Sequence, residues 1–261
     1  MTEEKTAIVT GAYGAIGKAI ARQIAEKGFA VVLAGKRENK LQDAAEEIRK
    51  QTGNNKVRYE VVDVSLNSSI SSMAGRWKGP LHVLINNAVT APWKRTETEE
   101  GVEVEFATNV LGYFRMIINF TDFMKQAGQA RIVNVASYWA GNLDLNDLEF
   151  MKRKFNNDTA YRQSKQADRM LTVAFAEKLK KDGITVNSCH PGDVNSKVSN
   201  CLGYGGHETP DEGAATPVWL ATEPSLEKVT GKYFANKKEA SCEFSRDEMA
   251  INKLYSVCER Y

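Results

Sequence analysis

The fold is decided by the stretch Ala7-Ile8-Val9-Thr10-Gly11-Ala12-Tyr13-Gly14-Ala15-Ile16-Gly17. Its beginning is apolar and predicts a short buried strand, whereas Ile16, Ile20 and Ile24 recur at helical spacing. Glycines therefore stand where a strand turns directly into a helix. This order is typical of an α/β domain built on a parallel sheet.

The same alternation continues along the chain. Further strands are predicted at Phe29–Ala34, Val57–Val62, Leu81–Ile85, Arg131–Val135, Ile184–Ser188 and Lys232–Phe234. Helices are predicted from Leu41 to Gly53, over about Glu99–Phe123 and Asp158–Lys181, and after the capping patterns at Thr209 and Ser245, the last one with Met249 and Leu254 turned inward. We expect one doubly wound Rossmann domain over residues 1–261, with a mostly parallel sheet and helices on both faces.

Composition excludes several classes of protein. A hydrophobic content of 42%, a charged content of 26% and a net charge of +2 are those of an ordinary globular chain, so neither nucleic acid nor an anionic membrane is expected as a partner. No run reaches the length of a membrane span, and no signal peptide is expected before the first apolar strand. The four cysteines lack metal-ligand spacing, so we expect free thiols, no metal and a cytoplasmic location.

The glycine-rich turn is a candidate phosphate site. Backbone N–H groups and the positive end of the following helix would face a pyrophosphate, and small residues would let it approach. An ordinary tight turn would also use glycine, but the strand–turn–helix context favours a dinucleotide. The residues expected to contact it are Gly11, Tyr13, Gly14, Ala15, Ile16 and Gly17.

The end of the second strand indicates which dinucleotide is bound. An acidic residue there would bind the ribose 2′-hydroxyl, whereas this chain has Lys36 and Arg37 after Gly35. We interpret both cations as ligands of a 2′-phosphate and expect NADP(H). The alternative is that they only begin a surface helix, and Glu38 follows immediately.

Tyr161 and Lys165 form a candidate catalytic pair. Four residues apart on a helix, their side chains project from one face. A phenol with an ordinary pKa of about 10 is poorly matched to proton transfer at neutral pH. An ammonium about 4 Å away would contribute ~4 kcal/mol, or about three pKa units, at an effective dielectric constant near 20. We therefore expect the lysine to lower the pKa of the phenol, although chance pairs with this spacing are common.

With these residues in view, the chain resembles the short-chain dehydrogenase/reductase family along almost its whole length. Tyr161-Arg162-Gln163-Ser164-Lys165 is similar to the YxxSK motif, and the Thr10–Gly17 loop is similar to the TGxxxGxG motif. Other landmarks follow in register: Asp63-Val64, Asn86-Asn87-Ala88-Val89, Thr108-Asn109-Val110-Leu111-Gly112, Val135-Ala136-Ser137 and Pro191-Gly192-Asp193-Val194-Asn195-Ser196.

The resemblance implies roles for the matching residues. Tyr161 is the general acid or base, Lys165 lowers its pKa and holds the nicotinamide ribose, and Ser137 stabilises the substrate oxygen. Asn109 would position a water that connects Lys165 to solvent. Further cofactor contacts would come from Asp63, Val64, Asn87, Ala88, Val89, Pro191, Gly192, Val194 and Ser196.

The nearest likeness is to the retinol-dehydrogenase-like branch, because 24 positions separate Ser137 from Tyr161 and include an insertion that contains Asn142–Phe155. This implies a carbonyl reductase or alcohol dehydrogenase acting on a small, lipophilic aldehyde, ketone or secondary alcohol. The family likeness also implies a homodimer or homotetramer. Trp93, Trp139 and two segments, 142–157 and Asn200–His207, are candidates for the substrate end, with Phe155, Leu202 and Tyr204 suited to an apolar ligand or to ordinary packing. Glycines 203, 205 and 206 suggest a mobile lid, and His207 is expected to be a surface residue.

Two residues depart from the family pattern. Ala15 stands at the middle glycine of the loop and Val89 at the last glycine of NNAG, and both add bulk where a cofactor would lie. These departures keep open an alternative, a catalytically silent nucleotide-binding scaffold or redox sensor of the same fold. An epimerase or dehydratase that retains its nicotinamide is a third hypothesis, less favoured because the C-terminal region is short.

Overall fold

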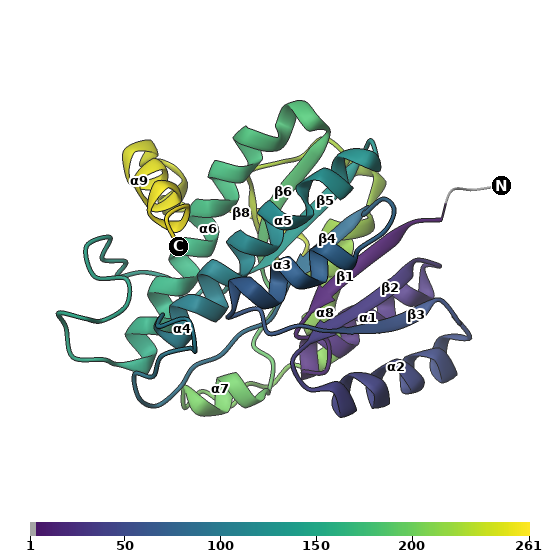
Figure 1. Ribbon diagram of the computed structural model, residues 1–261, viewed down its shortest axis with the longest axis horizontal. Coiled ribbons are helices and arrows are strands. Elements are labelled where there is room, and N and C mark those ends of the chain that lie inside the picture. Colours follow the sequence, from purple (N-terminus) through teal and green to yellow (C-terminus); the bar gives the residue numbers. More distant parts are fainter. Residues whose placement is uncertain (1–3) are drawn as a thin grey trace.

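An eight-stranded sheet forms the centre of the computed structural model, which describes residues 4–261 (Figure 1). The strand order is β3-β2-β1-β4-β5-β6-β7-β8, with β1 to β7 parallel and β8 antiparallel to β7. The strands are β1 (Thr6–Thr10), β2 (Ala30–Gly35), β3 (Val57–Val61), β4 (Val83–Asn86), β5 (Ala130–Val135), β6 (Ile184–His190), β7 (Tyr233–Ala235) and β8 (Lys238–Ala240). The order reverses between β1 and β4, and open α/β sheets bind ligands at that point.

Helices cover both faces of the sheet, so the predicted fold class is confirmed. One layer consists of α1 (Ala15–Glu26), α2 (Glu38–Thr52) and α8 (Pro210–Thr222); the other consists of α3 (Asn67–Arg76), α5 (Gly112–Gln126) and α6 (Asn157–Leu179), with α9 (Glu248–Cys258) packed outside α6 (Figure 1). Alternate side chains of β1 serve the two cores, since Ile8 packs with α3 and α5 whereas Ala7 and Val9 pack with α1. None of the helices within residues 4–261 has the length and apolar character that crossing a bilayer requires.

The predicted helix Glu99–Phe123 begins too early. The chain becomes helical only at α4 (Val104–Phe106), because Glu103 caps this end by accepting hydrogen bonds from the N–H groups of Glu105 and Phe106 at 2.8 and 2.7 Å. A π-helical turn, η1 (Ala107–Leu111), then joins α4 to α5. Glu99 and Glu100 lie in the preceding turn.

The capping pattern at Thr209 is confirmed, whereas the one at Ser245 is wrong. Thr209 and Glu212 form a reciprocal capping box at the start of α8. At α9 the cap is Asp247, whose carboxylate accepts from the N–H of Ala250, and Ser245 lies in a separate 3-10 turn. This shift leaves Met249 84% exposed, against our expectation, while Leu254 is fully buried as expected.

Several short elements lie outside the predicted pattern. These are α3, α7 (Lys197–Cys201), β8, and the 3-10 turns η2 (Lys180–Asp182), η3 (Pro224–Leu226) and η4 (Glu243–Ser245). A two-residue turn joins β7 to β8, with Asn236 at φ 49° and Lys237 at φ 56°. Two successive positive φ values are those of the hairpin turn that matches the twist of a sheet.

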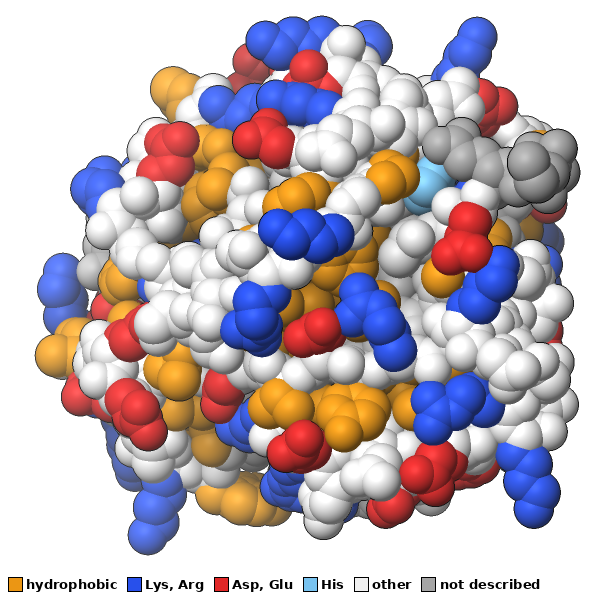
Figure 2. All heavy atoms as spheres, turned by 45° about the vertical axis from the view of Figure 1, so that its right-hand side comes forward, with side chains coloured by type: hydrophobic (Ala, Val, Ile, Leu, Met, Phe, Trp, Pro, Cys, Tyr) orange, Lys and Arg blue, Asp and Glu red, His pale blue; other side chains and the backbone are white. Residues whose placement is uncertain are grey.

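Charged side chains are interspersed on the molecular surface. Figure 2 shows Lys and Arg alternating with Asp and Glu over the face it draws, so this face offers no extended patch of one sign.

Candidate active site

One cavity of about 590 Å³ runs along the carboxyl ends of the parallel strands. It is lined by the turn after β1, by the residues that follow β2, β3 and β4, and by Ser137 after β5. His190 at the end of β6, Pro191–Val194 and Ser196 complete this part of the lining. The lining includes every residue predicted for the cofactor and every predicted catalytic residue except Asn109. Residues far apart in sequence therefore meet here because parallel strands all end on one side of the sheet.

The glycine-rich turn is shaped for close approach. A Cβ on Gly17 would lie 2.4 Å from the carbonyl oxygen of Gly11, and one on Gly11, whose φ is +65°, would lie 2.8 Å from Cα of Ala88. Gly14 caps α1 without a side-chain hydrogen bond, and the first turn of α1 holds no acidic residue. The first N–H groups of α1 thus remain available to an anionic ligand.

The end of β4 is fixed to this turn by Thr10. Its hydroxyl accepts hydrogen bonds from the N–H groups of Asn87 and Ala88 at 2.9 and 3.0 Å, and its carbonyl accepts from Nδ2 of Asn87 at 2.9 Å. Ala15 and Val89, the two departures from the family pattern, both line the cavity. Their side chains narrow it without closing it.

The two cations after β2 lie at one end of the cavity. The ammonium of Lys36 is 3.3 Å from Asp63 Oδ2, whereas the exposed Arg37 has no ion pair within residues 4–261. Burial acts to raise the pKa of Asp63, but hydrogen bonds from Ser65 and the charge of Lys36 lower it overall. This end of the cavity therefore contains one compensated and one uncompensated cation.

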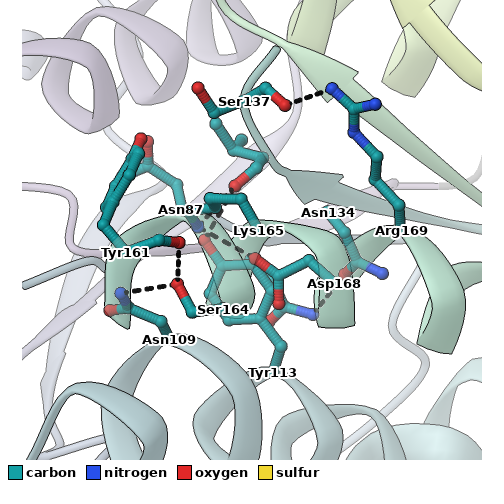
Figure 3. A network of polar contacts seen from close by, with 12 residues as sticks. Asn87, Asn109, Tyr113, Asn134, Ser137, Tyr161, Ser164, Lys165, Asp168 and Arg169 are labelled. Carbon is teal, nitrogen blue, oxygen red and sulfur yellow. Dashed lines mark hydrogen bonds and ion pairs between the residues drawn. The ribbon is translucent and has the colours of Figure 1, made fainter. Parts of the chain in front are cut away.

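The predicted catalytic residues lie around the middle of the cavity. Tyr161 and Lys165 come from the first turns of α6, and Ser137 follows β5 (Figure 3). The N–H of Trp139 donates to Oγ of Ser137 at 3.1 Å, and a hydrogen bond between Ser137 and Tyr161 acts on the phenol. Arg169 donates to the carbonyl oxygen of Ser137 and so holds its backbone. The hydroxyl, the phenol and the ammonium are brought together.

The electrostatics of Tyr161 differ from our expectation. Burial raises the pKa of the phenol above its ordinary value, and the charge of Lys165 offsets only part of this. The ammonium lies 5.9 Å from the centroid of the Tyr161 ring and is 2.9 Å from a carboxylate, Asp168 Oδ2. The charge of Lys165 thus lowers the pKa of the phenol, as predicted, but the lowering is smaller than the rise caused by burial. An ammonium that is paired with a carboxylate acts on its neighbours more weakly than a free one.

Asn109 lies in the π-helical turn η1 and is fully buried. Its Oδ1 accepts from the N–H of Thr90 at 2.9 Å, and its Nδ2 donates to Thr90 O at 3.0 Å and to Ser164 Oγ at 3.1 Å. Ser164 in turn donates to the carbonyl oxygen of Tyr161 at 2.7 Å. The amide thus reaches the Tyr161 backbone through one hydroxyl and is outside the cavity lining (Figure 3).

Aromatic side chains form the other end of the cavity. The rings of Trp139 and Tyr204 lie 4.2 Å apart, and the phenol of Tyr204 donates to Asp158 Oδ1. Cys201, Leu202 and the 70% exposed Trp93 complete the wall. The insertion contributes no lining residue between 142 and 157, since Phe155 packs on Phe150 instead.

Two buried carboxyl groups beside the site were missed at the sequence level. Asp168 is fully enclosed next to Lys165, and burial raises its pKa to about 6. Glu105 lies 3.4 Å from Nδ2 of Asn109, and burial raises its pKa to about 9. Both stand in amphipathic helical sequence, where an acidic residue normally indicates a solvated position, so the pattern offered no means of finding them.

Comparison with known proteins decides the family. The profile described as short chain dehydrogenase matches residues 5–203. The chain belongs to this family. Human retinol dehydrogenase 13 is 32% identical over 277 residues, covering 98% of this chain and 84% of that protein. Together with the other retinol dehydrogenases that match, it places this short-chain dehydrogenase in the retinol-dehydrogenase-like branch, as expected.

Two solved structures share its architecture. One is an uncharacterised protein from Mycobacterium paratuberculosis, with a TM-score of 0.83 and 23% identity, covering 98% of this chain and 92% of that chain. Another is a variant of actinorhodin polyketide ketoreductase with NADPH, with a TM-score of 0.68 and 25% identity over 88% of this chain and 95% of that chain. The short-chain dehydrogenase described here is thus an oxidoreductase by family.

Proposed function

We propose that this oxidoreductase uses NADP(H) and exchanges a hydride with a lipophilic aldehyde, ketone or secondary alcohol. The supporting observation is that one cavity connects the cations Lys36 and Arg37 to the hydroxyl, phenol and ammonium of Ser137, Tyr161 and Lys165. A cofactor lying along it would have its 2′-phosphate at one end and its reactive ring at the other. The hydride is the chemistry that a bound nicotinamide supplies.

The residues present fit such a cofactor. The positions where a Cβ would collide, Gly11 and Gly17, leave a cradle above the free N–H groups of α1. The guanidinium of Arg37, which has no ion pair among the described residues, offers the parallel donors that suit a phosphate. A related structure is described with NADPH, which agrees with this assignment. We assign the ribose to Lys165 and the nicotinamide side to Val89, Pro191, Gly192, Val194 and Ser196.

In the proposed mechanism Tyr161 transfers the proton. During reduction the phenol donates its proton to the substrate oxygen, and during oxidation the phenolate removes it. Ser137 donates a hydrogen bond to the same oxygen and stabilises its developing charge. Asn109, whose amide is bonded to Ser164 and Thr90, acts in this proposal by fixing the start of α6 rather than by binding a water in the cavity.

The aromatic end of the cavity supports a lipophilic substrate. Trp93, Trp139, Leu202 and Tyr204 offer apolar surface next to the catalytic residues. A chain or ring system on the substrate would bury against these side chains at roughly 25 cal/mol per Å². Polar atoms would be confined to the carbonyl or alcohol group near Ser137.

The test is to measure NADPH and NADH oxidation against a panel of lipophilic aldehydes and ketones, with Tyr161→Phe beside the wild type. We expect turnover with NADPH, and a loss of about 10²-fold or more in Tyr161→Phe with little change in the NADPH dissociation constant. Tight NADPH binding without turnover of any panel member would favour the alternative, a silent scaffold or sensor. Equal rates with NADH would contradict the assignment of Lys36 and Arg37.

A further inference from the structure

Asp168, a residue of α6, binds the ammonium of Lys165 with its carboxylate. The distance from Lys165 Nζ to Asp168 Oδ2 is 2.9 Å, and the two side chains are 2% and 0% exposed. The same ammonium donates to the carbonyl oxygen of Val135 at 3.1 Å. This is an ion pair enclosed by protein on the inner side of the active site, not a contact on a solvated helix face.

The geometry accounts for the direction in which the ammonium points. A lysine ammonium has three protons, and Asp168 and the Val135 carbonyl take two of them. Lys165 also lines the cavity, so its third proton can reach a partner there or the hydroxyl of Tyr113. Without Asp168 the ammonium would have one fixed acceptor and could turn about its long side chain.

The pair is costly to bury, which argues against a purely structural role. Taking both charges out of water costs several kcal/mol per ion before their attraction is counted. The other oxygen of Asp168, Oδ1, has no hydrogen-bond partner within the described residues. A neutral packing residue would avoid both costs, so the effect of Asp168 is expected in the neighbouring site.

We propose that Asp168 is a positioning residue that directs the Lys165 ammonium into the active site and offsets part of the positive charge that Tyr161 would otherwise experience. This inference rests on the proposed function of Tyr161 and Lys165. It adds a third group to the proton-transfer machinery.

Other ionisable groups face this pair, and all of them are still present when Asp168 is substituted. They are Glu105 on α4, Tyr113 on α5, Tyr161 on α6 and Cys189 on β6 around Lys165, with Cys258 on α9 beside Asp168. Burial raises the pKa of Glu105 to about 9, so this carboxyl is neutral near pH 7 and does not replace the charge of Asp168. Asp168 is then the carboxylate that compensates Lys165 near neutral pH.

The experiment uses Asp168→Asn, which keeps the shape and removes the charge. Phenolate absorbance is titrated for each protein with and without Tyr161→Phe, so that the difference isolates this one phenol without cofactor or substrate. We expect the Tyr161 step to move to lower pH by about one unit in Asp168→Asn. Asp168→Glu should retain the wild-type step, and Asp182→Asn, on the turn after α6, serves as the matched control. An unmoved step in a folded Asp168→Asn protein overturns the proposal.

A second measurement covers the case in which Asp168→Asn does not fold. In the wild type, a slowly exchanging lysine ammonium resonance that disappears in Lys165→Met would show the enclosed pair, and its absence would overturn the proposal. The pH profile of turnover is the third readout, in which the limb assigned to Tyr161 should shift with the spectroscopic step. If no substrate is turned over, the proposed function fails while the two spectroscopic measurements still decide the role of Asp168.

Discussion

Replacing Arg37 by serine tests the cofactor end of the cavity. Arg37 is exposed and has no ion pair within residues 4–261, so its guanidinium is free to bind a 2′-phosphate. A hydrogen bond to a charged group contributes about 1.5–3 kcal/mol, and exposure to solvent favours the lower value. A loss of ~1.5 kcal/mol corresponds to about a tenfold weaker preference for NADPH over NADH.

The neighbouring cation should have a smaller effect. Lys36 already lies 3.3 Å from Asp63, and its side chain is 56% exposed, so a phosphate would share it with that carboxylate. For Lys36→Ala we expect about a threefold loss of preference, in line with a screened surface contact. The two effects together should weaken as the salt concentration rises.

The assay is the ratio of kcat/KM for NADPH to that for NADH, or the ratio of dissociation constants from nucleotide fluorescence if no substrate is found. Lys40→Ser is the matched control, because Lys40 lies in the first turn of α2, the helix that Arg37 precedes, but outside the cavity lining. An unchanged ratio in Arg37→Ser would refute the assignment. So would an equal loss in the control, since the effect would then come from net charge rather than from a contact.

Three further outcomes are expected. Gly17→Ala should lower Tm by several degrees, because the added Cβ would lie 2.4 Å from Gly11 O and overpacking costs about 1–3 kcal/mol. Gly75→Ala is the control and should be neutral or stabilising, because its Cβ would meet open space; equal changes in Tm for the two variants would contradict the reasoning. Burial raises the pKa of Glu105 to about 9, so the unfolded chain ionises this carboxyl first and the protein loses stability as the pH rises from the unfolded-state pKa towards 9. Glu105→Gln should therefore raise Tm near about pH 8 and leave Tm unchanged near about pH 4. The same change in Tm at both pH values would show that burial of the charge is not the cause. Tyr204→Phe removes the hydrogen bond to Asp158 and should raise KM for bulky apolar substrates about threefold with little change in kcat, whereas a fall in kcat alone would exclude a role in substrate binding.

The sequence allowed the residues proposed for the cofactor to be assigned to one cavity because they are adjacent in the chain. Gly11 to Gly17 lie in one turn, and Lys36 and Arg37 follow one strand, so knowing where a strand ends is enough to place them. Periodicity also located all the parallel strands to within a few residues. The start of the helix near Glu103 was missed because a side-chain cap, and not a change in periodicity, determines where the helix begins.

The charge balance of the catalytic half depends on tertiary contacts. Whether Asp168 and Glu105 face solvent or protein depends on how α4, α5 and α6 pack, and each residue alone is compatible with either. The pKa of Tyr161 follows from that packing: the spacing predicted the lowering by Lys165 correctly but not the larger rise caused by burial. Residue identities and spacings give the candidate reacting groups, while the ionisation of these groups depends on their enclosed surroundings.

The hairpin of β7 and β8 has a consequence for the behaviour of the chain in concentrated solution. A parallel sheet that ended on β7 would present an open row of peptide groups, to which strands of other molecules could add. Here a three-residue strand covers that row, and its outer border carries the charged side chains of Lys238 and Glu239. At the opposite border β3 carries Arg58 and Glu60, which are paired with each other at 2.7 Å. Short length and charged side chains at the two edge strands thus disfavour pairing with strands of other molecules.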